Sequence, residues 1–67
     1  MKWVELHDWD GRRVYGSVQM TFYKGGRKTY QIVGLGKYDG RLFERELESI
    51  RELSKEEVVR LRLRGEL

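Results

Sequence analysis

The chain has 67 residues, a net charge of +3 and no cysteine. A chain of this length forms one small domain, residues 1–67, and buries only about 60% of its unfolded surface. The lack of cysteine excludes disulfides and thiolate metal sites, and a single histidine, His7, disfavours a histidine-based zinc site. No apolar run reaches the roughly 20 residues of a membrane span, and the N-terminus lacks the apolar region of a signal peptide. We therefore expect a cytoplasmic protein with no membrane partner and no cofactor.

The first eight residues predict a strand with one buried face, because Val4 and Leu6 alternate with polar residues. A turn is predicted at Asp8-Trp9-Asp10-Gly11, since aspartate favours turn starts and glycine accepts a left-handed backbone. The register of this first hairpin decides whether Trp3 faces the core, because a slip of one residue exchanges the two faces of a strand.

Two long strands are predicted next, Arg12–Lys24 and Arg27–Tyr38, joined by Gly25-Gly26. Two glycines accept the positive φ angles of a tight primed turn. With that turn, residues whose numbers sum to 51 face each other, so that Val18 would pair with Val33. Glycines inside strands indicate bends or close backbone approach, and such bends curl a small sheet into a barrel. The interior glycines are Gly16, Gly34 and Gly36.

The second face of this hairpin predicts a nucleic-acid interface. Residues 11–38 contain no acidic residue, and strand alternation gathers basic and aromatic side chains on the face opposite the core. Lysine and arginine neutralise phosphates, aromatic rings stack on unpaired bases, and a two-stranded ribbon fits the DNA major groove. The expected partner is nucleic acid, with DNA favoured over RNA. The expected interface residues are Arg13, Tyr15, Tyr23, Lys24, Arg27, Lys28, Tyr30 and Tyr38.

The pattern changes after a predicted turn at Asp39-Gly40. From Leu42 to Leu53 the apolar residues recur at helical spacing, and the residue types are good helix formers. A strand would place Arg45 on the apolar side, so a helix over 42–53 is the preferred interpretation. Residues 41–45 are also compatible with a strand that continues from the turn.

The last segment carries two conflicting signals. Residues 54–57, Ser-Lys-Glu-Glu, have the pattern of a capping box, which begins a helix. Val59, Leu61 and Leu63 alternate strictly with arginines, which predicts a strand over Val58–Arg64 with one buried face. We favour the strand. The predicted core is then Val14, Val18, Met20, Phe22, Val33, Leu35, Phe43, Leu47, Ile50, Leu53, Val59, Leu61 and Leu63.

Three segments resemble a known group of small domains: Tyr30-Gln-Ile-Val-Gly34, Asp39-Gly-Arg-Leu-Phe43 and Leu47-Glu-Ser-Ile50-Arg-Glu-Leu53. Together they are similar to the SH3-like β-barrels of the WYL-domain type, over about half of the chain. At the position of the Trp-Tyr-Leu tripeptide that names the group, this chain has Thr29-Tyr30-Gln31. The resemblance implies a barrel that senses a ligand or contacts nucleic acid.

Charge is divided unevenly along the chain. Residues 1–41 hold eight basic and four acidic residues, whereas residues 42–67 hold six and seven. Positive charge confined to one part of a domain indicates a surface that binds a polyanion. Charged residues make up 37% of the chain, which lacks proline, alanine and asparagine, and this composition suggests a thermophilic source.

The predicted fold is α+β and mostly β: a three-stranded antiparallel meander, a covering helix and a C-terminal strand, closing as a small SH3-like barrel. The predicted function is non-enzymatic binding of nucleic acid with little sequence specificity, since no nucleophile–base pair is recognisable. The alternative is a protein-interaction or regulatory module, such as a viral accessory protein. Exposed tyrosine and arginine are also enriched at protein interfaces, so the same face would then bind a protein partner or form a homodimer.

Overall fold

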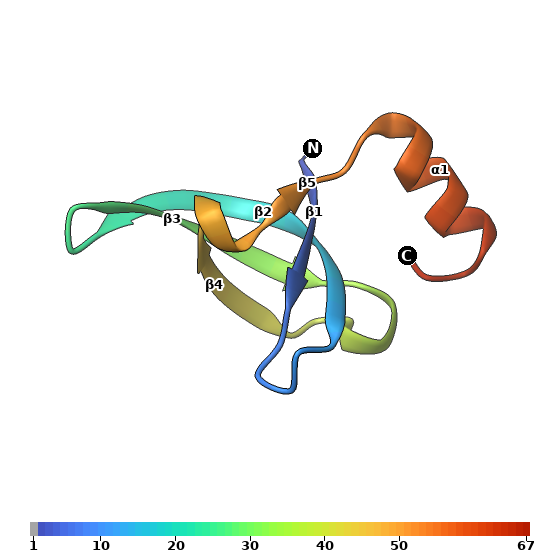
Figure 1. Ribbon diagram of the computed structural model, residues 1–67, viewed down its shortest axis with the longest axis horizontal. Helices are drawn as coiled ribbons and strands as arrows, with labels where there is room; N and C mark the ends of the chain where they lie inside the picture. The colour runs from blue at the N-terminus through green and yellow to red at the C-terminus, as the bar shows by residue number, and fades with distance from the viewer. Residues whose placement is uncertain (1) are drawn as a thin grey trace.

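Strands make up most of the secondary structure in the computed structural model, which describes residues 2–67 (Figure 1). One five-stranded antiparallel sheet and one α-helix give an α+β fold that is mostly β, as the sequence predicts. The predicted first strand begins at Met1, which lies outside the described residues. The elements are β1 (Trp3–His7), β2 (Arg13–Lys24), β3 (Arg27–Gly34), the 3-10 turn η1 (Gly36–Tyr38), β4 (Leu42–Glu46), the 3-10 turn η2 (Leu47–Ser49), β5 (Arg51–Glu52) and α1 (Lys55–Leu63).

The strands pair in the order β4-β3-β2-β1-β5, and each pairing is antiparallel. The first three strands form the predicted meander. The chain then adds β4 beside β3 and returns, after η2, to place the two-residue β5 beside β1. Figure 1 shows β2 bending as it runs from the turn after β1 into the projecting hairpin. Both outer strands therefore come from the segment 42–52.

The β2–β3 hairpin has the predicted turn but only part of the predicted register. Gly25 and Gly26 both have positive φ, and the pairs nearest the turn, such as Phe22 with Thr29, sum to 51 as expected. A bulge at residue 19 then shifts the register, so that Val18 pairs with Ile32. Because an extra residue in one strand exchanges its faces, the core side of β3 carries its even-numbered residues. The prediction placed these residues on the exposed face, which is wrong.

The main core lies on one face of the sheet and draws on four strands. Its buried residues are Val4, Leu6, Val14, Tyr30, Ile32 and Phe43, and we call this set the main core. Gly16 lies opposite Gly34 within it. A Cβ on Gly16 would lie 2.5 Å from Ile32 Cγ2, and one on Gly34 would lie 2.5 Å from the Tyr38 carbonyl oxygen. These two glycines allow the close approach that interior strand glycines predict.

The predicted core is confirmed only in part. Four of its residues are buried: Val14, Phe43, Leu53 and Leu61. Five are half-buried: Val18, Phe22, Val33, Leu35 and Ile50. Four are exposed, so their prediction is wrong: Met20, Leu47, Val59 and Leu63. Phe22 is expected from the sequence to pack against Phe43 or Ile50, but beyond the bulge the Phe22 and Phe43 side chains lie on opposite faces of the sheet.

The predicted helix over 42–53 is wrong, because this segment forms β4, η2 and β5. Pairing with β3 places Phe43 beside Ile32, where its ring completes the main core. Helix propensity is a weak preference, and burial against a sheet overrides it here. The alternative of a strand at residues 41–45 matches β4, Leu42–Glu46, to within one residue at each end.

The predicted strand over Val58–Arg64 is also wrong, because these residues lie in α1 and its C-terminal turn. The capping box is present: the Ser54 hydroxyl accepts from the Glu57 N–H, and a Glu57 carboxylate oxygen accepts from the Ser54 N–H. The other end is a Schellman motif in which Gly65 has positive φ and Glu66 N–H donates to the Leu61 carbonyl. These caps override the alternating pattern.

The helix builds a second apolar cluster on the other face of the sheet. Leu53, Val58 and Leu61 are buried together, and we call them the helix cluster. Trp3, Tyr15 and Leu67 pack against it while remaining half-buried. Trp3 therefore faces away from the main core and lies under α1. The sequence predicts a helix over the core face of the sheet, whereas α1 packs at the other face and comes from a different segment of the chain.

Candidate nucleic-acid interface

The eight residues predicted for the interface lie in three separate places. Four of them surround the turn of the β2–β3 hairpin: Tyr23, Lys24, Arg27 and Lys28. Three lie toward the opposite end of the sheet, next to the C-terminal segment: Arg13, Tyr15 and Tyr38. Tyr30 is a member of the main core. The structure therefore brings four of the eight residues together and separates the others from them.

The four residues at the turn belong to a projecting ribbon. Pairing of β4 with β3 ends at Thr29, and pairing of β1 with β2 ends at Ser17. Residues 23–28 consequently extend beyond the rest of the sheet as a two-stranded ribbon, and we call them the hairpin tip (Figure 1). Tyr23 is 73% exposed there. A ribbon of this kind presents its side chains without a neighbouring strand on either side.

The cations of the hairpin tip divide between its two faces. On one face Lys24 Nζ lies 3.2 Å from a Glu44 carboxylate oxygen, and Arg27 Nη1 lies 3.2 Å from Glu46. On the other face Lys28 Nζ lies 5.8 Å from the Tyr30 ring centroid. Ion pairs between exposed side chains contribute little to stability, so a phosphate can replace either glutamate.

Tyr30 cannot stack on a base, contrary to the sequence prediction. Its side chain is 5% exposed, and Lys2 and Lys28 both lie within 6 Å of its ring. The bulge at residue 19 is the physical reason, because it turns the even-numbered side chains of β3 toward the core. Tyr23 is the exposed ring at this end of the molecule.

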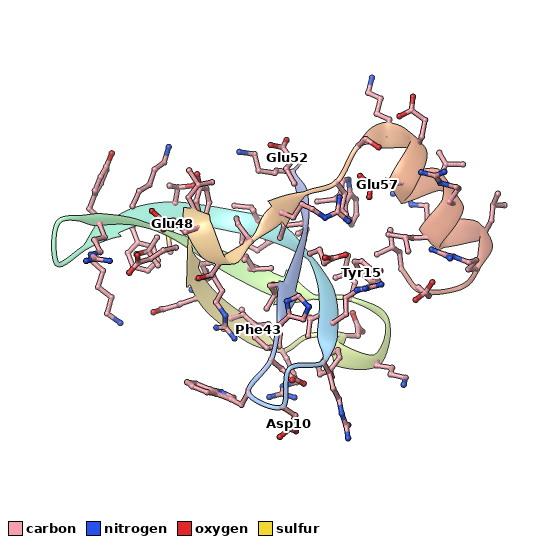
Figure 2. All side chains as sticks on the ribbon, viewed as in Figure 1. Asp10, Tyr15, Phe43, Glu48, Glu52 and Glu57 are labelled. Carbon is pink, nitrogen blue, oxygen red and sulfur yellow. The ribbon has the colours of Figure 1, made fainter. Side chains whose placement is uncertain are left out.

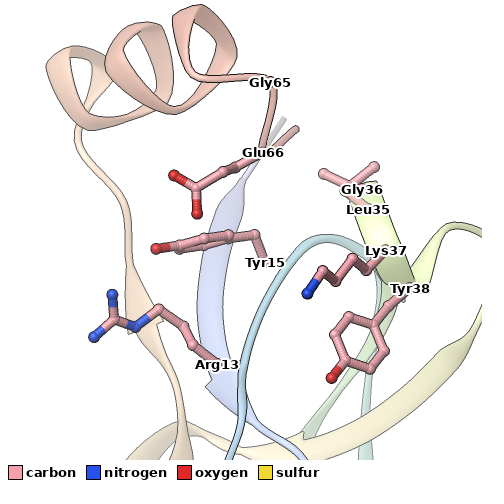
Figure 3. Close-up of a pocket in the computed structure, with 8 residues that line it drawn as sticks. All are labelled: Arg13, Tyr15, Leu35, Gly36, Lys37, Tyr38, Gly65 and Glu66. Atoms are coloured by element: carbon pink, nitrogen blue, oxygen red, sulfur yellow. The ribbon is translucent and has the colours of Figure 1, made fainter.

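Arg13, Tyr15 and Tyr38 line a pocket of about 220 Å³ beside the C-terminal segment (Figure 3). All three have structural contacts. Arg13 Nε lies 3.5 Å from Glu5, and Tyr15 packs against the helix cluster. The Tyr38 hydroxyl donates to Asp8 Oδ2 at 2.8 Å, and this hydrogen bond raises the pKa of Tyr38. The pocket belongs to the contact between sheet and C-terminus, and Glu66 also lines it.

A row of alternating arginines and aromatic rings was missed by the sequence argument. It starts at Trp9 in the β1–β2 turn and ends at Tyr38 of η1. Between them lie Arg45 and Phe43 of β4 and Arg41, which precedes β4. The Arg45 guanidinium lies 6.0 Å from the Trp9 ring and 5.5 Å from the Phe43 ring, measured to the centroids. Arg41 lies 5.4 Å from Phe43 and 5.5 Å from Tyr38. We call these five residues the arginine–aromatic row. The sequence feature that could have indicated this row is the tryptophan inside the Asp-Trp-Asp-Gly turn.

Neither a metal site nor a membrane span is found in residues 2–67. No group of three His, Cys, Asp or Glu side chains among them is placed to hold a metal ion. The only α-helix in this part of the chain, α1, has nine residues, too few to cross a membrane. No family model, curated protein or solved structure matches the chain.

Proposed function

We propose that the protein binds nucleic acid with little sequence specificity, and that the hairpin tip makes the main contact. The observation that carries the proposal is the tip itself: a projecting two-stranded ribbon with three cations, an exposed tyrosine and no acidic residue. Side chains of such a ribbon reach the edges and backbone of a DNA groove. The contacts expected from lysine and arginine are with phosphates, which carry no sequence information, so low specificity follows.

The proposal is tested by measuring fluorescence anisotropy of a labelled duplex over a range of salt concentrations. Lys28→Ala should weaken binding to all sequences alike and lower the log–log salt slope by roughly one, as one lost phosphate contact requires. The matched control is Lys55→Ala, which removes the same charge from the exposed start of α1. Equal effects of the two substitutions would contradict a contact at the tip.

The ion pairs of the tip give a second test with the opposite sign. Glu44 competes with phosphate for Lys24, so Glu44→Gln should strengthen binding. Glu56→Gln is the control, because Glu56 is an exposed carboxylate on α1. If the wild-type protein binds no nucleic acid at low salt, where the electrostatic contribution is largest, the proposal fails and the tip is better explained as a protein-binding surface.

We also propose that the curved sheet closes as an SH3-like barrel of the WYL type. Two features support it. The two edge strands, β4 and β5, are separated only by the 3-10 turn η2. Arg45 Nη2 donates to the His7 carbonyl at 3.1 Å and so links β4 to β1. An experimental structure in which β4 and β1 are too far apart for this link would contradict the barrel.

A further inference from the structure

Trp9 is the most exposed large apolar residue of the described chain. Its side chain is 93% exposed, although tryptophan is on average one of the more buried residues. The turn that carries it is firmly fixed. Asp8 Oδ1 accepts from the backbone N–H groups of Asp10 and Arg12 at 2.9 Å each, and Asp8 Oδ2 accepts from Tyr38. Because these hydrogen bonds fix the backbone of the turn, the turn loses little conformational entropy when a ligand covers the ring.

The arginine–aromatic row continues from this ring, and its middle ring, Phe43, is buried in the main core. Arg45 is held in place by its own hydrogen bonds, from Nη1 to the Glu44 carbonyl at 2.8 Å and from Nη2 to His7. With its terminal nitrogens so engaged, the guanidinium stays within 6.0 Å of the Trp9 ring centroid and 5.5 Å of the Phe43 ring centroid. The row then reaches Arg41, an exposed cation for which no ion pair is found within residues 2–67.

We propose that Trp9 is a stacking site for an unpaired base of single-stranded nucleic acid, with Arg41 contacting the phosphate backbone of the same strand. This inference rests on the proposed function and adds the class of partner. A duplex hides the faces of its bases, whereas a single strand offers them to aromatic rings. Trp9 lies between two aspartates, Asp8 and Asp10, whose carboxylates repel phosphate. The contribution that we expect from the indole is therefore base stacking.

The test compares an oligothymidylate of about 12 nucleotides with a duplex of the same length, by fluorescence anisotropy. Trp9→Ala should weaken binding to the single strand roughly 5- to 150-fold, the range expected for one stacked base. Its salt slope should be unchanged, because no charge is lost, and duplex binding should also be unchanged. Leu63→Ala is the matched control, since Leu63 is another highly exposed apolar residue, at the end of α1.

A second readout is tryptophan emission. Oligothymidylate should quench the emission of the wild-type protein, and Trp9→Phe should remove most of that quenching while keeping much of the affinity. Unchanged single-strand binding in Trp9→Ala would overturn the inference and leave the hairpin tip as the duplex contact. An equal loss on duplex and single strand would also overturn it. If neither nucleic acid binds the wild-type protein, the proposed function itself fails.

Discussion

The main core and the helix cluster stabilise opposite faces of one sheet, and they differ in how far apart in sequence their members lie. The main core joins side chains from β1, β2, β3 and β4. The buried residues of the helix cluster all come from residues 53–61, and they pack against side chains on one face of the sheet. A nine-residue helix is too short to be stable alone in water. The helix therefore depends on its contact with the sheet.

An ion network lies at the boundary between the two regions. Glu5 on β1 lies 3.1 Å from Arg51, and the same guanidinium lies 2.8 Å from Glu57 on α1. In Figure 2, Glu57 and Tyr15 lie toward the helix, whereas Phe43 and Asp10 lie on the side of the β1–β2 turn. Both proposed binding elements belong to the sheet side of the molecule: the hairpin tip is part of β2 and β3, and the arginine–aromatic row includes Phe43 of the main core. Loosening the helix should therefore leave binding largely intact.

Ile32→Ala should have the largest effect on stability. Ile32 is fully buried in the main core. Its Cγ2 would lie 2.5 Å from a Cβ placed on Gly16, so its side chain packs directly against that glycine. Truncating such a side chain costs about 2–5 kcal/mol, a large share of the stability of a small domain. Urea denaturation measures the loss. Val33→Ala is the matched control, because Val33 is the next residue of β3 and faces the other side. A larger loss from Val33→Ala than from Ile32→Ala would mean that the faces of β3 are exchanged.

Leu61→Ala should have a smaller effect that is confined to one region. Leu61 is buried in the helix cluster, and we expect a cost of about 2 kcal/mol, at the low end for a buried leucine. We expect the helix to open without unfolding the sheet, so hydrogen exchange should accelerate in α1 while amides of β2 and β3 keep their protection. Leu63→Ala should change neither. Loss of protection throughout the sheet would show that the two clusters form one cooperative unit.

Ser54→Ala removes half of the capping box and should cost about 1 kcal/mol. The reason is that the Glu57 N–H loses its acceptor at the start of α1. Ser49→Ala in η2 is the control, because Ser49 is also exposed. Urea denaturation followed by helix circular dichroism measures the difference. A cost equal to that of the control would mean that packing, and not capping, determines where the helix begins.

The sequence predicts the first half of this fold better than the second half. The turns at Asp8–Gly11 and Gly25–Gly26 follow from local chemistry, and the meander follows from them. The bulge at residue 19 has no local signal, yet it decides which face of β3 is buried and removes Tyr30 from the candidate site. In the second half, a helix-like pattern becomes strand because β3 offers Phe43 a place beside Ile32.

The candidate site shows the same limit. Tyr23, Lys24, Arg27 and Lys28 are brought together because they flank one turn, which local chemistry specifies. The arginine–aromatic row is not visible in the sequence, since it joins the β1–β2 turn to β4, and Trp9 and Arg45 are separated by 36 positions in the sequence. Such contacts depend on strand order and register. Those are properties of the whole sheet and cannot be derived from any one segment.

Acidification should have the smallest effect of these changes, and it should loosen α1 before it loosens the main core. The pKa of the Glu57 carboxylate is lowered below its ordinary value of 4.5. The largest cause is the hydrogen bond from the Ser54 N–H, and the second is the hydrogen bond from Arg51. A carboxylate with a lowered folded-state pKa stabilises the fold fully above its unfolded value, and that contribution disappears as the pH falls through the folded value. We therefore expect α1 to loosen below pH 4.5, before the main core does. NMR shifts of the Val58 and Ile32 amides report on the two regions.

Asp8 also has a lowered pKa, through backbone hydrogen bonding, and contributes to the sheet side. Glu57→Gln isolates the helix: glutamine can still accept the Ser54 N–H but does not titrate in this range. The pH dependence at Val58 should shrink in that variant and stay unchanged at Ile32. Identical pH profiles in both proteins would mean that Glu57 does not couple protonation to the docking of α1.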